Sequence, residues 1–377
     1  GLFQRLALTS LPGRTLVSPL SQLAASMLQY AADDDPGQPA DLAQVTEQLA
    51  LGLDLEPSEL LVRKVDTFAK LPQISIDLPT YDAYRAMDEA LDGSGRYEGS
   101  VLPRVLVAMA KVSSLATQLA YVLAGMRLDA AGVAANSGAG LNAALRQEGA
   151  AAYYAVAQLL STSTLNATND AVGDGALTDL LYHALGKQGL GLSLEILPEG
   201  AEASLRGGMV ACMSQYDADL AYAGEDGLRS LPVNYTENSA LGQKRTCPMS
   251  STAGELELNC PGGELQGEED GNSSTRISPE QQAALQELRF ELSRTAFVCN
   301  GVVPAFMQAL VRGAMAPADF DAKISPAAFS DSLSRAEQRV MLQTGRTYSP
   351  LPPPLPPAAP PLPPPSTPPS NPAPAVQ

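Results

Sequence analysis

The chain is poor in the side chains from which most catalytic and metal sites are built. Its 377 residues include one histidine, His183, no tryptophan and only 5% aromatic residues. A single imidazole excludes most triad, dyad and metal schemes, so we interpret His183 as a structural histidine. Few aromatic platforms accompany the many acids, which argues against a glycosidase with paired carboxylates. We therefore expect no catalytic residue, no metal ligand and no cofactor, and predict that the chain is not an enzyme.

Long apolar runs and positive charge are also lacking. No run of 18 or more apolar residues occurs, which predicts no membrane span. The net charge is −17, so phosphate backbones and anionic membrane surfaces are unfavourable partners, and we expect no nucleic-acid binding. The chain begins at Gly1 rather than Met, which indicates a removed signal peptide or a segment of a longer protein.

Four cysteines are present, and none of them is in a Cys-x-x-Cys pair, which argues against zinc. An even count is compatible with two disulfides, and the spacing favours Cys247–Cys260 across a loop and Cys212–Cys299 between two helices. Other pairings stay open, because sequence does not determine connectivity.

Three N-glycosylation sequons begin at Asn166, Asn234 and Asn272. Together with the even cysteine count, they predict a secreted, extracellular protein.

The apolar residues, 45% of the chain, recur mostly at helical spacing. Ser18-Pro19 and Ser278-Pro279 mark helix starts, and 101–124 is the most regular helix, with Gly125 as its expected C-cap. Pro304 should kink or split a helix, and 231–271 is expected to be a long loop. The predicted fold is mainly α: a helical bundle or array as head, a disulfide-stapled loop region and an extended tail. The expected regions are a β-like lead-in at 1–17, a helical domain at 18–190, a second helical region at 191–345 and a tail at 346–377.

Part of the helical head resembles a known module. The segments 16–23 (LVSPLSQL), 49–53 (LALGL) and 78–82 (LPTYD), followed by an alanine-rich helix, look like a helical module of large secreted adhesin-like surface proteins. The resemblance covers roughly residues 10–190 and carries no catalytic residue. It implies a surface protein and favours an adhesin or carbohydrate-binding head as the alternative function.

The end of the chain, 349–377, is about half proline. Proline lacks the amide donor that helices and sheet ladders need, so polyproline II is the conformation that remains. Such a tail is typical of a glycosylated stalk, of a ligand for aromatic-lined grooves, or of a flexible linker.

The tail also resembles the hydroxyproline-rich glycoproteins of plant and green-algal walls and flagellar surfaces. That resemblance implies hydroxylation and O-glycosylation at a set of tail positions: Pro350, Pro352, Pro353, Pro354, Pro356, Pro357, Pro360, Pro361, Pro363, Pro364, Pro365, Ser366, Pro368 and Pro369. The sequence therefore predicts a non-enzymatic extracellular structural glycoprotein that self-assembles in a cell wall, coat or fibril. Its expected partners are further copies, other wall or surface glycoproteins and covalent glycans.

Overall fold

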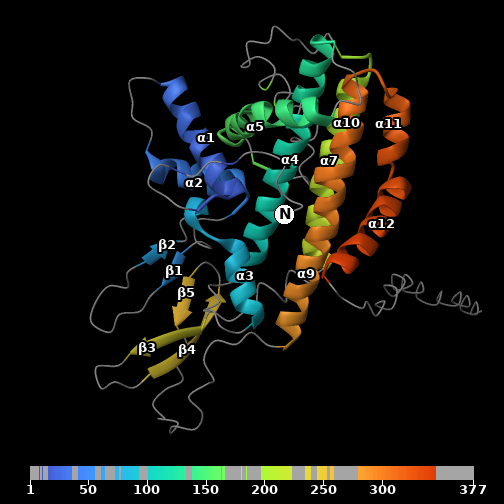
Figure 1. Ribbon diagram of the computed structural model, residues 1–377. Helices are drawn as coiled ribbons and strands as arrows, with labels where there is room; N and C mark the ends of the chain where they lie inside the picture. Colours follow the sequence, from blue (N-terminus) through green and yellow to red (C-terminus); the bar gives the residue numbers. More distant parts are fainter. Residues whose placement is uncertain are drawn as a thin grey trace, which may run out of the picture.

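The computed structural model describes part of the chain, and that part is mainly helical (Figure 1). The described residues are 8, 11, 16–35, 41–55, 61–63, 73–75, 78–92, 101–132, 138–162, 164–165, 180, 184, 197–222, 234–238, 244–252, 255–258 and 279–344.

The first described elements begin at the Ser-Pro start that the sequence predicts. Ser18 and Ser21 cap each other: the Ser21 amide donates to the Ser18 hydroxyl at 3.1 Å, and the Ser18 amide donates to the Ser21 hydroxyl at 2.8 Å. Asp41 caps the next helix by accepting from the Ala43 amide at 3.0 Å. These elements are α1 (Pro19–Asp34), α2 (Leu42–Gly52), the antiparallel pair β1 (Leu61–Arg63) and β2 (Gln73–Ser75), the short 3-10 helix η2 (Leu78–Thr80) and α3 (Ala83–Asp92).

The long helix α4 (Val101–Ala130) corrects the prediction that a helix ends at Gly125. Gly125 lies inside the helix, where α4 meets α10 (Val303–Val311). A Cβ atom at Gly125 would lie 2.5 Å from Cγ2 of Val311, closer than carbon atoms can pack. The glycine is therefore a point of close approach between two helices and not a cap.

Two further helices are α5 (Gly138–Leu160) and α7 (Ala201–Tyr222). Helix α7 continues through Gly207-Gly208. A Cβ atom at Gly208 would lie 2.7 Å from the Met307 side chain, so no larger residue fits there without a shift. Glycine at this position lets α7 approach α10 and α11 (Pro317–Ile324) closely.

The expected long loop at 231–271 is wrong in part, because it contains β3 (Asn234–Asn238), β4 (Lys244–Thr252) and β5 (Glu255–Leu258). The three strands pair antiparallel in chain order. Pro248 lies where β4 changes partner: β3 pairs up to Pro248, and β5 pairs from Met249 onward. The proline therefore falls at an edge of each pairing.

The last described elements form the C-terminal side of the head. Pro304 splits one long helical stretch as expected, and the break is a π-helical turn, η5 (Val298–Val302). The elements around it are α9 (Pro279–Phe297), α10, α11 and α12 (Pro326–Thr344).

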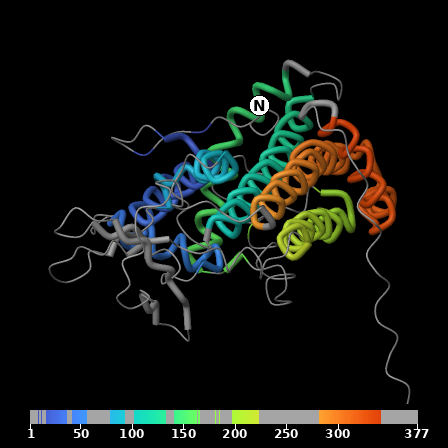
Figure 2. Tube along the Cα trace, turned by 90° about the horizontal axis from the view of Figure 1, so that it is seen from below, coloured from blue at the N-terminus to red at the C-terminus, as the bar shows by residue number. Residues whose placement is uncertain are grey.

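Helix α4 lies in the middle of the head. Figure 2 shows it with α9 and α10 on one side and α1, α2 and α5 on the other, and it contacts α1, α3, α5, α7, α9, η5 and α10. Buried leucine, alanine, valine and methionine residues from 18–190 and from 191–345 form one hydrophobic core. The two regions distinguished in the sequence therefore share a core.

Two described helical segments, Leu102–Ala130 and Gln281–Val311, are long and apolar enough to cross a bilayer by length and composition alone. Most of the first, 94% of its most apolar window, is buried inside the protein, against 56% for the second. Core packing accounts for the apolar character of the first, so composition here is weak evidence for a span. The absence of a span stays a prediction.

Several expectations fall mainly outside the described residues. The described positions of the lead-in, Leu8, Leu11, Leu16 and Val17, are not in strands, and Leu11 is buried against the helical core. The polyproline II tail expected from residue 346 lies outside the described part.

Candidate functional site: a pinned core beside a cationic groove

A disulfide ties two distant parts of the chain together inside the core. Cys212 of α7 and Cys299 of η5 are bonded, with their Cα atoms 5.7 Å apart and a sequence separation of 87. Both side chains are fully buried. This is the pairing between two helices that the sequence favoured. Cys260, half of the other expected pair, lies outside the described residues.

The π-helical turn beside the disulfide leaves one carbonyl without a helical donor, and α4 supplies donors for it. The Val303 amide donates to the Val298 carbonyl, five residues back, and Pro304 has no amide hydrogen to give. The Cys299 carbonyl accepts from the Gln118 amide at 3.3 Å and the Ser114 hydroxyl at 3.4 Å. Helix α4 thus holds the backbone of the disulfide cysteine in place.

Two carboxyl groups are buried where α7 and α9 pack. Glu291 and Asp219 are 5% and 2% exposed. Burial raises the pKa of Glu291 to about 7, with smaller contributions from Asp219, Glu287 and Glu337, against the opposing effect of Arg294. Arg294 pairs with Glu291 and lies 3.9 Å from Glu337 of α12. Burial also raises the pKa of Asp219, against a hydrogen bond of 2.8 Å from Gln215. Neither carboxyl lines the groove described below.

Buried ion pairs also fix α4 to its neighbours. Arg127 pairs with Glu148 of α5, whose side chain is fully buried, and Lys111 pairs with Asp217 of α7. Burial raises the pKa of Glu148, and the charge and hydrogen bond of Arg127 oppose that rise. Removing Arg127 would leave the buried Glu148 carboxylate uncompensated, and removing Asp217 would do the same to the nearly buried Lys111, so either loss should destabilise the head.

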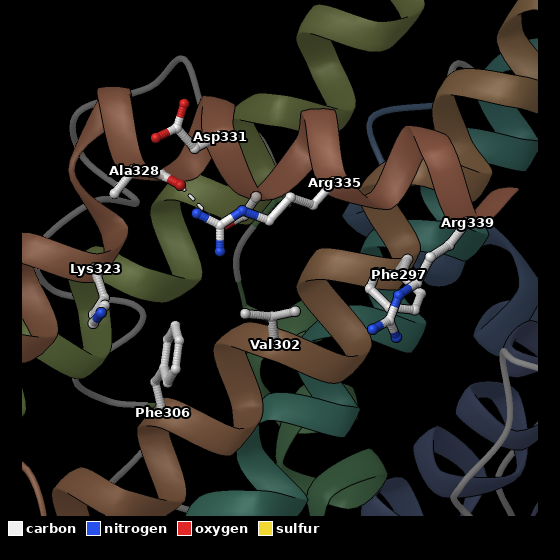
Figure 3. A pocket seen from close by; sticks show the side chains of 9 residues that line it. Phe297, Val302, Phe306, Lys323, Ala328, Asp331, Arg335 and Arg339 are labelled. Atoms are coloured by element: carbon white, nitrogen blue, oxygen red, sulfur yellow. Dashed lines mark hydrogen bonds between the residues drawn. The ribbon is translucent and has the colours of Figure 1, made fainter. Parts of the chain in front are cut away.

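A groove opens where α12 lies over α10 and η5, with a cavity of about 290 Å³ (Figure 3). We call it the α10–α12 groove and define it by its lining residues: Phe297, Val302, Phe306, Lys323, Ala328, Asp331, Ser332, Arg335 and Arg339. Phe297, Val302 and Phe306 are partly buried and form the apolar part of the lining, whereas the charged side chains are exposed.

The charges of the groove are predominantly positive. The lining contains three basic residues, Lys323, Arg335 and Arg339, and one acidic residue, Asp331. The Asp331 carboxylate points away from the apolar residues in Figure 3. The Arg339 guanidinium lies 5.3 Å from the centre of the Phe297 ring, a cation–π contact. Within the described part of the chain, Lys323 and Arg335 have no ion-pair partner.

The groove has no evident catalytic group. Ser332 is its one hydroxyl, and that hydroxyl donates to the Ala328 carbonyl at 2.9 Å, as a serine within a helix commonly does. No group of three or more metal-ligating side chains occurs among the described residues. What the groove offers is donors and an apolar surface, which suits binding.

The sequence did not single out the groove. Its one signal was the spacing of Asp331, Arg335 and Arg339, which places three charges on one face of α12. Phe297, Val302 and Phe306 lie before, within and after a π-helical turn that periodicity does not predict.

Of the predicted site residues, few lie in the described part. Asn234 opens β3 opposite Pro248, and Cys247 lies opposite Tyr235. His183, Asn166, Asn272, Cys260 and the tail prolines lie outside it.

Comparisons of the chain with protein-family models, with curated proteins and with solved structures give no match.

Proposed function

We propose that this chain is a secreted, non-enzymatic structural glycoprotein, with a helical head and a glycosylated proline-rich tail. The observation that carries the proposal is the Cys212–Cys299 disulfide in the centre of the helical core. Such bonds form and persist in oxidising compartments, including the extracellular space. A bond between helices 87 residues apart also stabilises a head exposed to harsh surroundings.

The tail supplies the second part of the proposal. Polyproline II has no internal hydrogen bonds and carries its side chains outward, where sugars can be attached without disturbing it. We propose that the head and its stalk-like tail form a self-assembling subunit of a wall, coat or fibril, together with other surface glycoproteins. A head-to-tail contact between copies that does not close would give a fibre.

The test is mass spectrometry of native material, without reduction. We expect a peptide containing Cys212 linked to one containing Cys299, and tail peptides from Ser349 onward that carry hydroxyl and pentose or hexose masses. A bare tail would refute the stalk, and free thiols at both cysteines would refute the extracellular assignment.

The α10–α12 groove favours a second function, an adhesin or carbohydrate-binding head displayed on the tail. Its cationic donors and the exposed parts of its apolar lining are suited to a ligand. Analytical ultracentrifugation separates the two functions: a fibre-former self-associates in an ordered way, whereas a displayed head binds glycan as a monomer.

A further inference from the structure

The α10–α12 groove collects positive charge on a strongly acidic protein. The chain carries 41 acidic against 24 basic residues, yet three basic residues and one acid line this groove. Lys323 comes from α11, and Arg335 and Arg339 come from successive turns of α12, so separate elements contribute the charges. In the described part of the chain no acid neutralises Lys323 or Arg335. The groove therefore presents positive charge that can pair with an anionic ligand.

The apolar side of the groove determines what kind of anion fits. Val302 and Phe306 line the cavity together with Lys323 and Arg335, and Phe297 lies beneath the Arg339 guanidinium (Figure 3). The face of an aromatic ring is electron-rich and attracts C–H groups that carry a small positive charge. A small, fully hydrated inorganic anion would use none of this surface. A sugar ring that carries a carboxylate would use both sides, since its C–H face packs on phenylalanine while its carboxylate reaches the guanidinium groups.

Size and backbone chemistry favour a sugar over an acidic peptide. A cavity of about 290 Å³ is at the small end of the range for ligand pockets, suited to a ring or two and not to a helix. Peptides that bind as strands need a free sheet edge, but the walls here are helices whose backbone groups are already paired. Sugar hydroxyls and a carboxylate can be bound by side chains alone.

We propose that the α10–α12 groove binds carboxylated sugars, one uronic acid residue of a longer acidic glycan at a time. Arg335 pairs with the carboxylate in the forked geometry that guanidinium and carboxylate share. Lys323 and Arg339 contribute positive charge, and Phe306 packs against the ring. This inference rests on the second function proposed above, a glycan-binding head, and names its ligand class.

The test titrates the intact, oxidised chain with three tetramers by calorimetry: tetragalacturonate, neutral maltotetraose and tetraglutamate. We expect tetragalacturonate to bind more tightly than the other two tetramers, and we expect its affinity to fall as the salt concentration is raised. Arg335→Gln should weaken it about tenfold, the effect of losing a charged hydrogen-bonded pair, and Arg335→Lys should restore part of the affinity.

Arg146→Gln is the matched control, because Arg146 is an exposed arginine on α5, outside the groove, and its replacement changes the net charge equally. It should leave binding unchanged, and circular dichroism should show the same helix content in all variants. Equal binding of tetragalacturonate to wild type and Arg335→Gln overturns the proposal, as does no binding. Equal or tighter binding of tetraglutamate assigns the groove to acidic peptides, and equal binding of maltotetraose removes the role of charge.

Failure here is distinguishable from failure of the structural role. The disulfide and the tail sugars are measured on native material without reference to the groove. If the Cys212–Cys299 bond and the tail sugars are found but tetragalacturonate does not bind, the proposed structural function stands and only the proposed ligand is refuted.

Discussion

Loss of the Cys212–Cys299 bond should cost the head a large share of its stability. The bond closes a loop with a sequence separation of 87 residues. The chain-entropy relation gives about 15 cal/mol/K for a loop of this length, or about 4.6 kcal/mol at 25 °C. Whole domains are stable by roughly 5–15 kcal/mol, so the loss of this bond should lower the urea midpoint of unfolding by a large fraction. Cys212→Ala/Cys299→Ala adds a packing cost, because both sulfur atoms are fully buried.

Urea unfolding of four samples separates the bond from the packing: wild type and Cys212→Ala/Cys299→Ala, each oxidised and reduced. Reduction of the double variant measures any other disulfide, and reduction of wild type measures that disulfide together with Cys212–Cys299. The difference between the two reductions should be about 4–5 kcal/mol by the same loop relation. A difference below about 1 kcal/mol would refute the entropic argument, as would peptide mapping that finds the two cysteines unlinked.

Two further substitutions test the buried carboxyl group and the close helix contact. The folded chain holds a proton on Glu291 that the unfolded chain loses, so stability should fall as pH rises from 4.5 to about 7. Glu291→Gln mimics the protonated acid: it should stabilise the head by up to about 3 kcal/mol at pH 8 and have little effect at pH 4, with exposed Glu47→Gln as control. A pH-independent effect would contradict this. Gly125→Ala should destabilise by about 1–2 kcal/mol, because its Cβ meets the stiff Val311 side chain, whereas Gly207→Ala, with ordinary contact at 3.5 Å, should be neutral or stabilising. Equal melting temperatures for the two alanine variants would refute the close approach.

Local signals predicted the helices well, because capping and apolar spacing depend on neighbours in the sequence. Pro19 and Pro279 are the first residues of α1 and α9, and Pro304 follows the break between α9 and α10. Gly125 was mistaken for a cap, because a glycine that ends a helix and one that admits a second helix look alike in sequence. Only Val311, far along the chain, distinguishes the two.

The strands and the groove depend on partners that the sequence does not bring together. The segment 231–271 was expected to be a loop, but it contains β3, β4 and β5, which pair with one another in antiparallel order. The groove combines side chains from α9 to α12, and their meeting depends on how a π-helical turn aims α10. Spacing along α12 placed its charges on one face but could not show that phenylalanines lie opposite.

The central position of α4 has a consequence for how the protein is made. This 30-residue helix is covered partly by α10, which begins about 170 residues after α4 ends. At roughly 5–20 residues per second, the ribosome needs roughly 10–35 s to synthesise that gap. For that time the apolar side of α4 that α10 later covers stays open to other chains, so we expect nascent chains to need protection until residue 311 emerges.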